Sequence, residues 1–208
     1  VIDEYEWFVM SDSSGVSDLF KQKLSEGKNI GIVSEAGCPG VADPGQALVA
    51  IAQEMGATVK PLVGPSAILL ALMASGMNGQ QFRFLGYLPI DSPQRAKTIK
   101  DLETESFKKN FTQIFIETPY RNNQLLEALI QHCKASTRLC IAVDITGKNE
   151  MIRTMKMAEW KTKMPNLHKQ PVIFCLNANA GSLTGRCQQD TCCRPARVKP
   201  RFSSYNEP

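Results

Sequence analysis

Short apolar runs rich in β-branched residues alternate with helical patterns over the first part of the chain. Residues 30–34 and 58–62 are typical of buried strands, and each is followed by a loop containing glycine and proline. Helices are expected after these loops, over 47–55 and 66–74, and an earlier helix over 18–26, where apolar residues recur at helical spacing. This order predicts the α/β class, with parallel strands joined by right-handed crossovers.

The same alternation starts again after a polar, glycine-containing stretch at 76–81. Strands are expected at Phe82 to Leu88, Thr112 to Glu117, Leu139 to Val143, Met151 to Met155 and Pro171 to Leu176, and helices at Ser92 to Phe107, Gln124 to Cys133 and Glu159 to Met164. We therefore divide the chain near residue 80 into an N-terminal α/β lobe (1–80) and a C-terminal α/β lobe (81–178).

Residues 179–208 differ in composition from both lobes. Gly, Ser, Thr, Gln, Pro and Arg dominate there and apolar periodicity is lost, so we expect a disordered, basic tail. Five basic and two acidic residues give this tail +3 of the net charge of +4. The rest of the chain carries only +1, so any contact with nucleic acid must come from a local basic patch.

The cysteines and histidines favour neither a disulfide framework nor a metal site. Seven cysteines are an odd number, and Cys133, Cys140 and Cys175 lie in apolar sequence, where a free thiol behaves as a small core side chain. We therefore expect a reducing, cytoplasmic compartment. His132 and His168 have no companions at metal-ligand spacing, and no apolar run has membrane-spanning length, so we expect no metal and no membrane partner.

The glycine- and proline-rich loop within 31–45 is the first candidate for a ligand site. It follows the predicted strand at 30–34, which would place it at the carboxyl edge of a sheet, where open α/β sheets bind ligands. Gly37 and Gly40 allow close approach of the backbone to a ligand and positive φ angles. Two further loops, at 63–67 and 118–123, stand at corresponding strand ends.

The residues of these loops follow one another as motifs: SEAGCP at 34–39 with ADPG at 42–45, PLVGPSA at 61–67, GYLP at 86–89, ETPYR at 117–121 and AVDIT at 142–146. In this order they resemble the tetrapyrrole methylase superfamily, and within it the branch of ribosomal RNA small-subunit methyltransferase I. The resemblance spans roughly residues 20 to 177. Any one motif would be weak, whereas the ordered set makes chance similarity a poor explanation.

The resemblance implies two α/β lobes with S-adenosylmethionine (SAM) between them, and a homodimer. It also implies transfer of the SAM methyl group to the 2′-hydroxyl of a cytidine ribose in small-subunit rRNA. Carried over by position, the cofactor contacts would be Ala36, Gly37, Cys38, Val41, Ser66 and Ala67, and from the second lobe Glu117 or Thr118 and Ile145 or Thr146. Nothing here matches the strand and loop with which family members begin, so we expect an incomplete N-terminal lobe.

A ribose hydroxyl is a poor nucleophile at neutral pH, so a base or hydrogen-bond acceptor is expected near it. Glu35, Glu117 and Asp144 stand at predicted strand ends, and each is a candidate; capping or pairing within a loop would explain a carboxylate there equally well. Arg121 and Tyr87, both within motifs, are candidates for binding the substrate phosphate and base.

Basic residues on the predicted helix at 92–107 leave two interpretations open. In the first interpretation, phosphates are contacted by Arg95, Lys97 and Lys100. In the second, which we favour, the same side chains form a solvated face of the helix.

Two other functions stay open at the level of sequence. The chain would methylate a tetrapyrrole or another small ring, or it would be a non-catalytic module that binds RNA or dimerises. The ETPYR motif argues against the first alternative, and the unmatched start of the family fold motivates the second.

Overall fold

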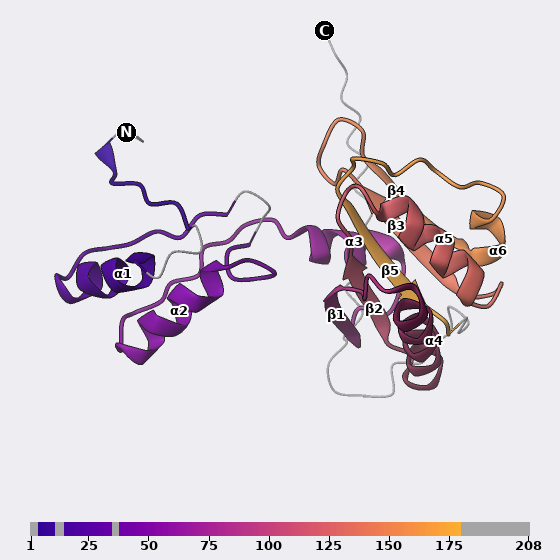
Figure 1. Ribbon diagram of the computed structural model, residues 1–208, viewed down its shortest axis with the longest axis horizontal. Coiled ribbons are helices and arrows are strands. Elements are labelled where there is room, and N and C mark those ends of the chain that lie inside the picture. Colours follow the sequence, from indigo (N-terminus) through magenta and orange to yellow (C-terminus); the bar gives the residue numbers. More distant parts are fainter. Residues whose placement is uncertain (1–3, 11–14, 35–37, 180–208) are drawn as a thin grey trace, which may run out of the picture.

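The computed structural model describes residues 4–10, 15–34 and 38–179 (Figure 1). The helices in these ranges are α1 (Gly15–Ser25), α2 (Gly45–Glu54), α3 (Ala67–Ser75), α4 (Ser92–Lys109), α5 (Asn122–His132) and α6 (Met157–Trp160), and the strands are β1 (Phe82–Tyr87), β2 (Thr112–Ile116), β3 (Arg138–Val143), β4 (Met151–Lys156) and β5 (Val172–Asn177). Among the described residues, no helix is both long and apolar enough to cross a membrane.

The strands form one mixed sheet in the order β1-β2-β5-β3-β4. Strand β1 is parallel to β2, whereas β5 lies between β2 and β3 and is antiparallel to both. Strand β4 is antiparallel to β3 and forms the other edge. Strands β1, β2 and β3 therefore run in the same direction, and their carboxyl ends lie at one edge of the sheet, called the carboxyl edge below.

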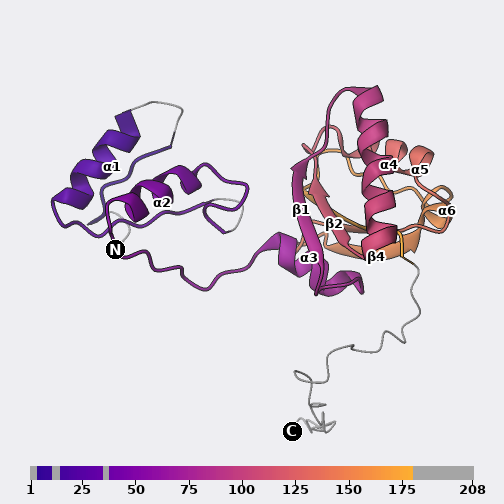
Figure 2. The same ribbon diagram turned by 90° about the horizontal axis from the view of Figure 1, so that it is seen from below.

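Alternate side chains of the central strands enter two different cores, as the period of a β-strand requires. In β3, Leu139, Ile141 and Val143 join a large cluster that contains residues of α4, α5 and α6. Cys140 and Ala142 point to the opposite face and pack with residues of α3. The sheet thus lies between α3 on one side and α4, α5 and α6 on the other (Figure 2).

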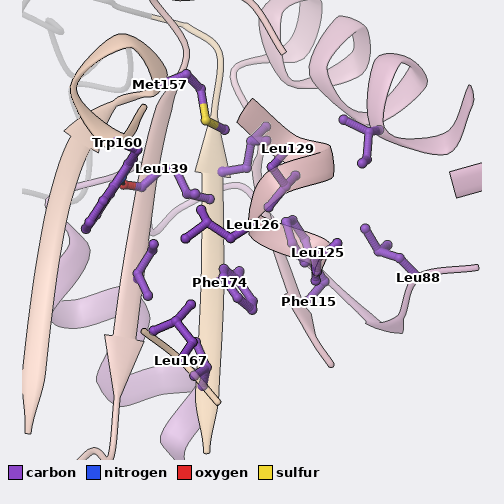
Figure 3. Packing of buried hydrophobic residues seen from close by; sticks show 14 of the residues in the cluster. Leu88, Phe115, Leu125, Leu126, Leu129, Leu139, Met157, Trp160, Leu167 and Phe174 are labelled. Atoms are coloured by element: carbon purple, nitrogen blue, oxygen red, sulfur yellow. Dashed lines mark hydrogen bonds between the residues drawn. The ribbon is translucent and has the colours of Figure 1, made fainter. Parts of the chain in front are cut away.

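The larger core is built around fully buried aromatic side chains (Figure 3). The rings of Phe115 and Phe174 stack across neighbouring strands with their centroids 5.8 Å apart. Trp160 of α6 is 1% exposed and donates from Nε1 to the Leu139 carbonyl at 2.9 Å, so its one polar atom is satisfied inside the core. This packing fixes the sheet that carries the loops discussed below.

The α/β class and the predicted elements of the C-terminal lobe are confirmed, with most ends shifted by one to a few residues. Helix α6 differs most, since it spans Met157–Trp160 and the sequence predicts 159–164. It starts early because the Glu159 carboxylate accepts from the backbone N–H of Lys156 at 3.0 Å and closes a cap there. The helices predicted over 18–26, 47–55 and 66–74 also form.

The strands predicted at 30–34 and 58–62 are wrong, because neither stretch is a strand in the structure. Their apolar side chains stay largely in solvent: Val33 is 75% exposed and Leu62 is 91% exposed. A strand is stabilised by ladder hydrogen bonds and by burial of one face, and no described strand lies beside either stretch to supply them. Propensity alone therefore does not make these stretches strands.

Helices α1 and α2 instead pack on each other, and both views place them apart from the sheet (Figures 1 and 2). Phe20, Leu48 and Ala52 form the centre of this small cluster, with Ile32 and other half-buried side chains around them. The N-terminal part of the described chain is therefore held by a few apolar contacts, in contrast to the large core under α4 and α5.

Helix α3 precedes the boundary predicted near residue 80, yet it packs on the sheet. Ala71 is fully buried there, and the Thr154 hydroxyl of β4 donates to the Ser75 carbonyl at 2.8 Å. The division into 1–80 and 81–178 stays a prediction. The tail predicted at 179–208 lies outside the described residues from 180 onward.

Candidate active site

The carboxyl edge of the sheet gathers the C-terminal-lobe residues that the sequence singles out. Tyr87 ends β1, Glu117 follows β2 and Asp144 follows β3. These three strands are not all neighbours, but their common direction brings the residues after them to the same edge. The loops at this edge therefore form one candidate site.

An open pocket of about 580 Å³ lies at this edge. It is lined by Tyr87, Leu88, Pro89, Ile90, Gln94, Thr118 and Arg121. Gly86, with a φ of 68°, coincides with a register shift between β1 and β2, and such a bulge re-aims the side chain that follows it. The structure thus brings together Tyr87, Thr118 and Arg121, three of the residues predicted from the motifs.

The start of α4 builds one wall of this pocket. The Asp91 carboxylate caps the helix by accepting from the Gln94 backbone N–H at 3.1 Å. Arg95 is 7% exposed and donates from Nη2 to the Ile90 carbonyl at 2.6 Å. The favoured interpretation, a solvated helix face, is therefore wrong for Arg95. Its guanidinium is buried and donates to a backbone carbonyl, whereas that of an exposed side chain would donate to water.

Lys97 and Lys100, on the same helix, are exposed as the solvated-face interpretation predicts. The pocket also contains residues that the sequence interpretation missed, above all Ile90 and Gln94. The sequence does indicate these residues, because an Asp followed by a Pro in the first turn, here Asp91 and Pro93, is typical of a helix start. This helix start follows directly on the GYLP motif.

The buried Glu117 carboxylate forms an ion pair with the half-buried Arg121 beside the pocket. The Glu117 side chain is 1% exposed, and its Oε1 accepts from the Arg121 Nη2 at 2.9 Å and Nε at 3.1 Å, as well as from the Thr118 backbone N–H at 2.7 Å. Within the described residues, no donor reaches Glu117 Oε2, although that atom is buried. The pair fixes the direction of a guanidinium whose side chain is 30% exposed.

The loop after β3 is closed by its own carboxylates. Asp144 has a φ of 47°, and its Oδ2 accepts from the Asn149 backbone N–H at 3.0 Å. The Glu150 carboxylate accepts from the Thr146 N–H at 2.6 Å. Ile145 and Thr146, both predicted cofactor contacts, lie inside this closed loop. The carboxylates of Asp144 and Glu117 therefore both accept hydrogen bonds from residues close to them in sequence. This local pairing is the alternative to a role as general base that the sequence leaves open.

The glycine-rich loop of the N-terminal part is organised by Asp43. Its Oδ1 accepts from the Gly45 N–H at 2.8 Å and from the Gly40 N–H at 3.2 Å. Gly40 has a φ of 80°, which makes the tight turn possible. Val41, a predicted cofactor contact, is 51% exposed in this loop.

The remaining predicted contacts of this loop lie partly outside the described residues. Glu35, Ala36 and Gly37 belong to that undescribed segment. Cys38 is half-buried and its thiol donates to the Pro65 carbonyl at 3.5 Å, which links the loop to the turn before α3, where Ser66 and Ala67 lie. No hydrogen bond or ion pair between described residues joins Cys38, Ser66 or Ala67 to the residues of the carboxyl edge.

Comparison with known proteins identifies the family. A model described as Tetrapyrrole (Corrin/Porphyrin) Methylases matches residues 13–161. The ribosomal RNA small subunit methyltransferase I of Vibrio cholerae serotype O1 is 34% identical over 158 residues, which cover 74% of this chain and 54% of that protein. The protein of the same name from Escherichia coli O157:H7 is 33% identical over 160 residues, which cover 76% and 54%. The chain thus spans about half the length of these curated relatives.

Solved structures support the same fold. The methyltransferase CobJ superposes with a TM-score of 0.52 at 20% identity, over 77% of this chain and 68% of that one. A uroporphyrin-III-C-methyltransferase from Thermus thermophilus superposes with a TM-score of 0.50 at 14% identity, over 79% and 71%. At such identities the likeness concerns the fold alone. Since the family model covers well over half of the sequence, the chain belongs to the tetrapyrrole (corrin/porphyrin) methylase family.

Proposed function

We propose that this chain is part of a SAM-dependent methyltransferase that methylates the 2′-hydroxyl of a cytidine ribose in small-subunit ribosomal RNA. The observation that carries the proposal is the family membership, together with relatives that are named ribosomal RNA small subunit methyltransferase I. The open pocket lined by Tyr87, Thr118 and Arg121 adds a place where residues of two motifs can meet a ligand.

The residues beside the pocket fit a cofactor with hydrogen-bond donors and positive charge. Glu117 Oε2 is buried without a donor among the described residues, and leaving such an atom unpaired costs about 1–3 kcal/mol. Thr118 lines the pocket next to it. We assign Glu117 and Thr118, with Ile145 and Thr146 of the loop after β3, to the cofactor side. SAM would supply a methyl group already activated on a sulfonium, so the protein's task is orientation and exclusion of water.

Arg121 is assigned to the substrate. Its Nε and Nη2 are occupied by Glu117, while Nη1 donates to no described residue. A guanidinium held in this way offers a fixed donor edge, which suits an RNA phosphate. Tyr87, 60% exposed at the mouth of the pocket, offers a ring on which a base can stack. Glu117 acts in this scheme as a positioning residue for Arg121, and the base stays open among Glu35, Glu117 and Asp144.

The cofactor contacts of the first lobe belong to the same proposal. Ala36, Gly37, Cys38 and Val41 would meet the cofactor from the glycine-rich loop, and Ser66 and Ala67 from the start of α3. The backbone N–H groups at a helix start are suited to a carboxylate such as that of the methionine moiety. The side chain of Ser66 makes no capping hydrogen bond, so its hydroxyl is not used by the helix.

We also propose a homodimer in the cytoplasm. Large apolar side chains lie in solvent along the segment before α3 and on that helix, where Leu62 is 91%, Leu69 is 49% and Met73 is 79% exposed, and a second copy would cover them. The cysteines among the described residues are free thiols, which fits a reducing compartment. Sedimentation velocity of the chain tests the dimer.

Transfer of tritiated methyl groups from SAM tests the function. The acceptors are small ribosomal subunits that lack the modification and, in a parallel arm, a porphyrinoid. Incorporation into the RNA, mapped to the ribose by nuclease digestion, supports the proposal. Incorporation into the porphyrinoid alone assigns the chain to small-ring methylation. Absence of both, with no SAM binding by isothermal titration, supports a non-catalytic module. The Arg121→Lys variant is expected to lower transfer to RNA while SAM still binds.

A further inference from the structure

Two exposed aromatic side chains lie against each other beside the pocket. The rings of Tyr120 and His168 meet edge to face, with their centroids 5.9 Å apart. Tyr120 comes from the turn between β2 and α5 and is 67% exposed, and His168 from the connection between α6 and β5 is exposed as well. Tyr120 lies in the turn between Thr118 and Arg121, which both line the pocket, although neither aromatic ring of the pair lines it.

The segment that carries His168 is fixed to the start of α5. The buried Asn122 donates from Nδ2 to the Gln170 carbonyl at 2.8 Å, and the Asn123 Oδ1 accepts from the Leu167 N–H at 2.8 Å. Leu167, which directly precedes His168, is fully buried (Figure 3). The Lys169 N–H also donates to the Pro119 carbonyl at 2.9 Å. These contacts fix the backbone that carries the two rings, while the rings themselves face solvent and contact each other.

The charges around this pair are positive. Lys169 is exposed next to His168, and the Arg121 guanidinium lies on the other side of Tyr120 in sequence. In the segments 117–121 and 166–170 the one acidic residue is Glu117, whose carboxylate is paired with Arg121, so Lys169 carries the uncompensated charge. An exposed aromatic pair beside a lysine and a guanidinium with an unused Nη1 matches the chemistry of an unpaired nucleotide, which has a stacking face and a phosphate on either side.

We propose that Tyr120 and His168 form a stacking platform for an unpaired RNA base next to the pocket, with Lys169 and Arg121 contacting the adjacent phosphates. The inference rests on the proposed function for its RNA substrate and adds a subsite to it. A nucleotide that flanks the target would occupy this platform, while the target nucleotide occupies the pocket. Because stacking accepts any base, the platform contributes affinity with little sequence preference.

Fluorescence anisotropy of the full 208-residue chain with a labelled single-stranded RNA of about twelve nucleotides tests the platform. Tyr120→Ala is expected to raise the Kd by about 5- to 150-fold, the range for one stacked base. Tyr120→Phe keeps the ring and is expected to change the Kd by less than about twofold. The matched control is Tyr5→Ala, because Tyr5 is 66% exposed and lies on the N-terminal part, and it should leave the Kd unchanged.

Lys169→Asn tests the phosphate contact. Asn tolerates the φ of 60° that Lys169 adopts, so the change removes charge without adding backbone strain. The slope of log K against log salt should become shallower by about 0.7 for one lost contact with a single strand. An unchanged slope together with an unchanged Kd of Tyr120→Ala overturns the proposal.

A second copy of the chain is the competing occupant of this surface. Sedimentation of Tyr120→Ala distinguishes it, since a lower oligomeric mass with an unchanged Kd for RNA overturns the platform. Isothermal titration with SAM on the same variants separates the two levels of inference. If the wild-type chain binds SAM but not the RNA probe, the platform is refuted and the proposed methyl transfer is not. If the chain binds the probe with the expected effects of the variants but does not bind SAM, the proposed function is refuted and the platform is not.

Discussion

The Asp43 carboxylate holds the glycine-rich loop closed by accepting from the Gly45 N–H at 2.8 Å. This hydrogen bond is the main cause of the lowered pKa of Asp43, followed by those from the Ser34 hydroxyl and the Gly40 N–H. An Asp whose pKa is lower in the folded state stabilises that state above its ordinary pKa of 3.8, and the contribution disappears as the pH falls through the lowered value. The loop is therefore expected to open in acid.

Amide exchange of Gly45 and Gly40 measures this opening. Asp43→Asn is expected to speed exchange at both amides at neutral pH, because a neutral amide oxygen accepts a weaker hydrogen bond than a carboxylate. In the wild type, protection corrected for intrinsic exchange should decline only below the ordinary pKa of 3.8. Equal protection in the variant and the wild type would show that Asp43 does not hold the loop.

The ion pair between Glu117 and Arg121 is expected to act as one unit. Replacing Glu117 by Ala leaves the guanidinium without its buried partner and should lower the free energy of unfolding by about 1–3 kcal/mol. Arg121→Ala in turn leaves the buried Glu117 carboxylate without its cation. Because each single variant leaves one charge unpaired, the double variant should lose less free energy of unfolding than the sum of the two single losses. Urea denaturation of the four proteins measures this. Additive losses would mean that the two side chains act independently.

Glu103 is expected to matter more than Glu105, a half-buried residue of the same helix. Its Oε1 accepts from the Lys134 N–H at 2.7 Å and from the hydroxyl of the buried Thr137, which fixes the turn between α5 and β3. Glu103→Gln is expected to cost about 1–3 kcal/mol in unfolding free energy, because an amide cannot replace a carboxylate toward two donors without loss. The control Glu105→Gln, at a side chain that is 25% exposed, should cost less than about 1 kcal/mol.

The buried thiols are expected to resist alkylation in the folded protein. Cys140 and Cys175 lie opposite each other in β3 and β5 and are fully buried, and the pKa of Cys175 is raised by its hydrogen bond with Cys140 and by burial. Burial also raises the pKa of Cys133. Among the four cysteines of the described residues, peptide mapping after brief treatment with N-ethylmaleimide at pH 8 should find Cys38 modified first. Fast modification of Cys175 would contradict the packing of α3 on the sheet.

Sequence patterns predicted the C-terminal lobe well because each strand there meets a neighbour and a helix. The run at 112–117 forms a buried strand between β1 and β5, and its apolar residues Ile114 and Phe115 enter opposite cores. The equally strand-like run at 30–34 remains irregular, because no described strand pairs with it. Periodicity describes what a segment can bury, and only the tertiary partners decide whether it does so.

The candidate site was predicted in part. Tyr87, Thr118 and Arg121, which come from two separate motifs, line one pocket, since parallel strands bring their carboxyl ends together, and their roles there stay predictions. Local pairing of Glu117 and Asp144 was open in the sequence, because a carboxylate at a strand end has the same signature whether it closes a loop or faces a ligand. The inward turn of Arg95 was not predictable, as it depends on the position of the Ile90 carbonyl.

Gly147 is expected to be the most sensitive glycine of the loop after β3. A Cβ atom built on it would lie 2.2 Å from Asp144 Oδ1, so Gly147→Ala must displace the carboxylate that accepts from the Asn149 N–H. Because Gly147 is exposed and the carboxylate can move, the expected cost is that of the lost hydrogen bond, about 1 kcal/mol. Thermal unfolding should therefore show a lower midpoint for Gly147→Ala, and isothermal titration should show weaker SAM binding if Ile145 and Thr146 contact the cofactor.

The control is Gly79→Ala, because nothing lies within 4 Å of a Cβ at Gly79. This change should stay within about 0.5 kcal/mol of the wild type. If Gly147→Ala were as stable as this control, Asp144 would not be held by the loop, and its carboxylate would be available to act as a base. A loss of SAM affinity in Gly147→Ala without loss of stability would instead assign Asp144 to the cofactor side of the site.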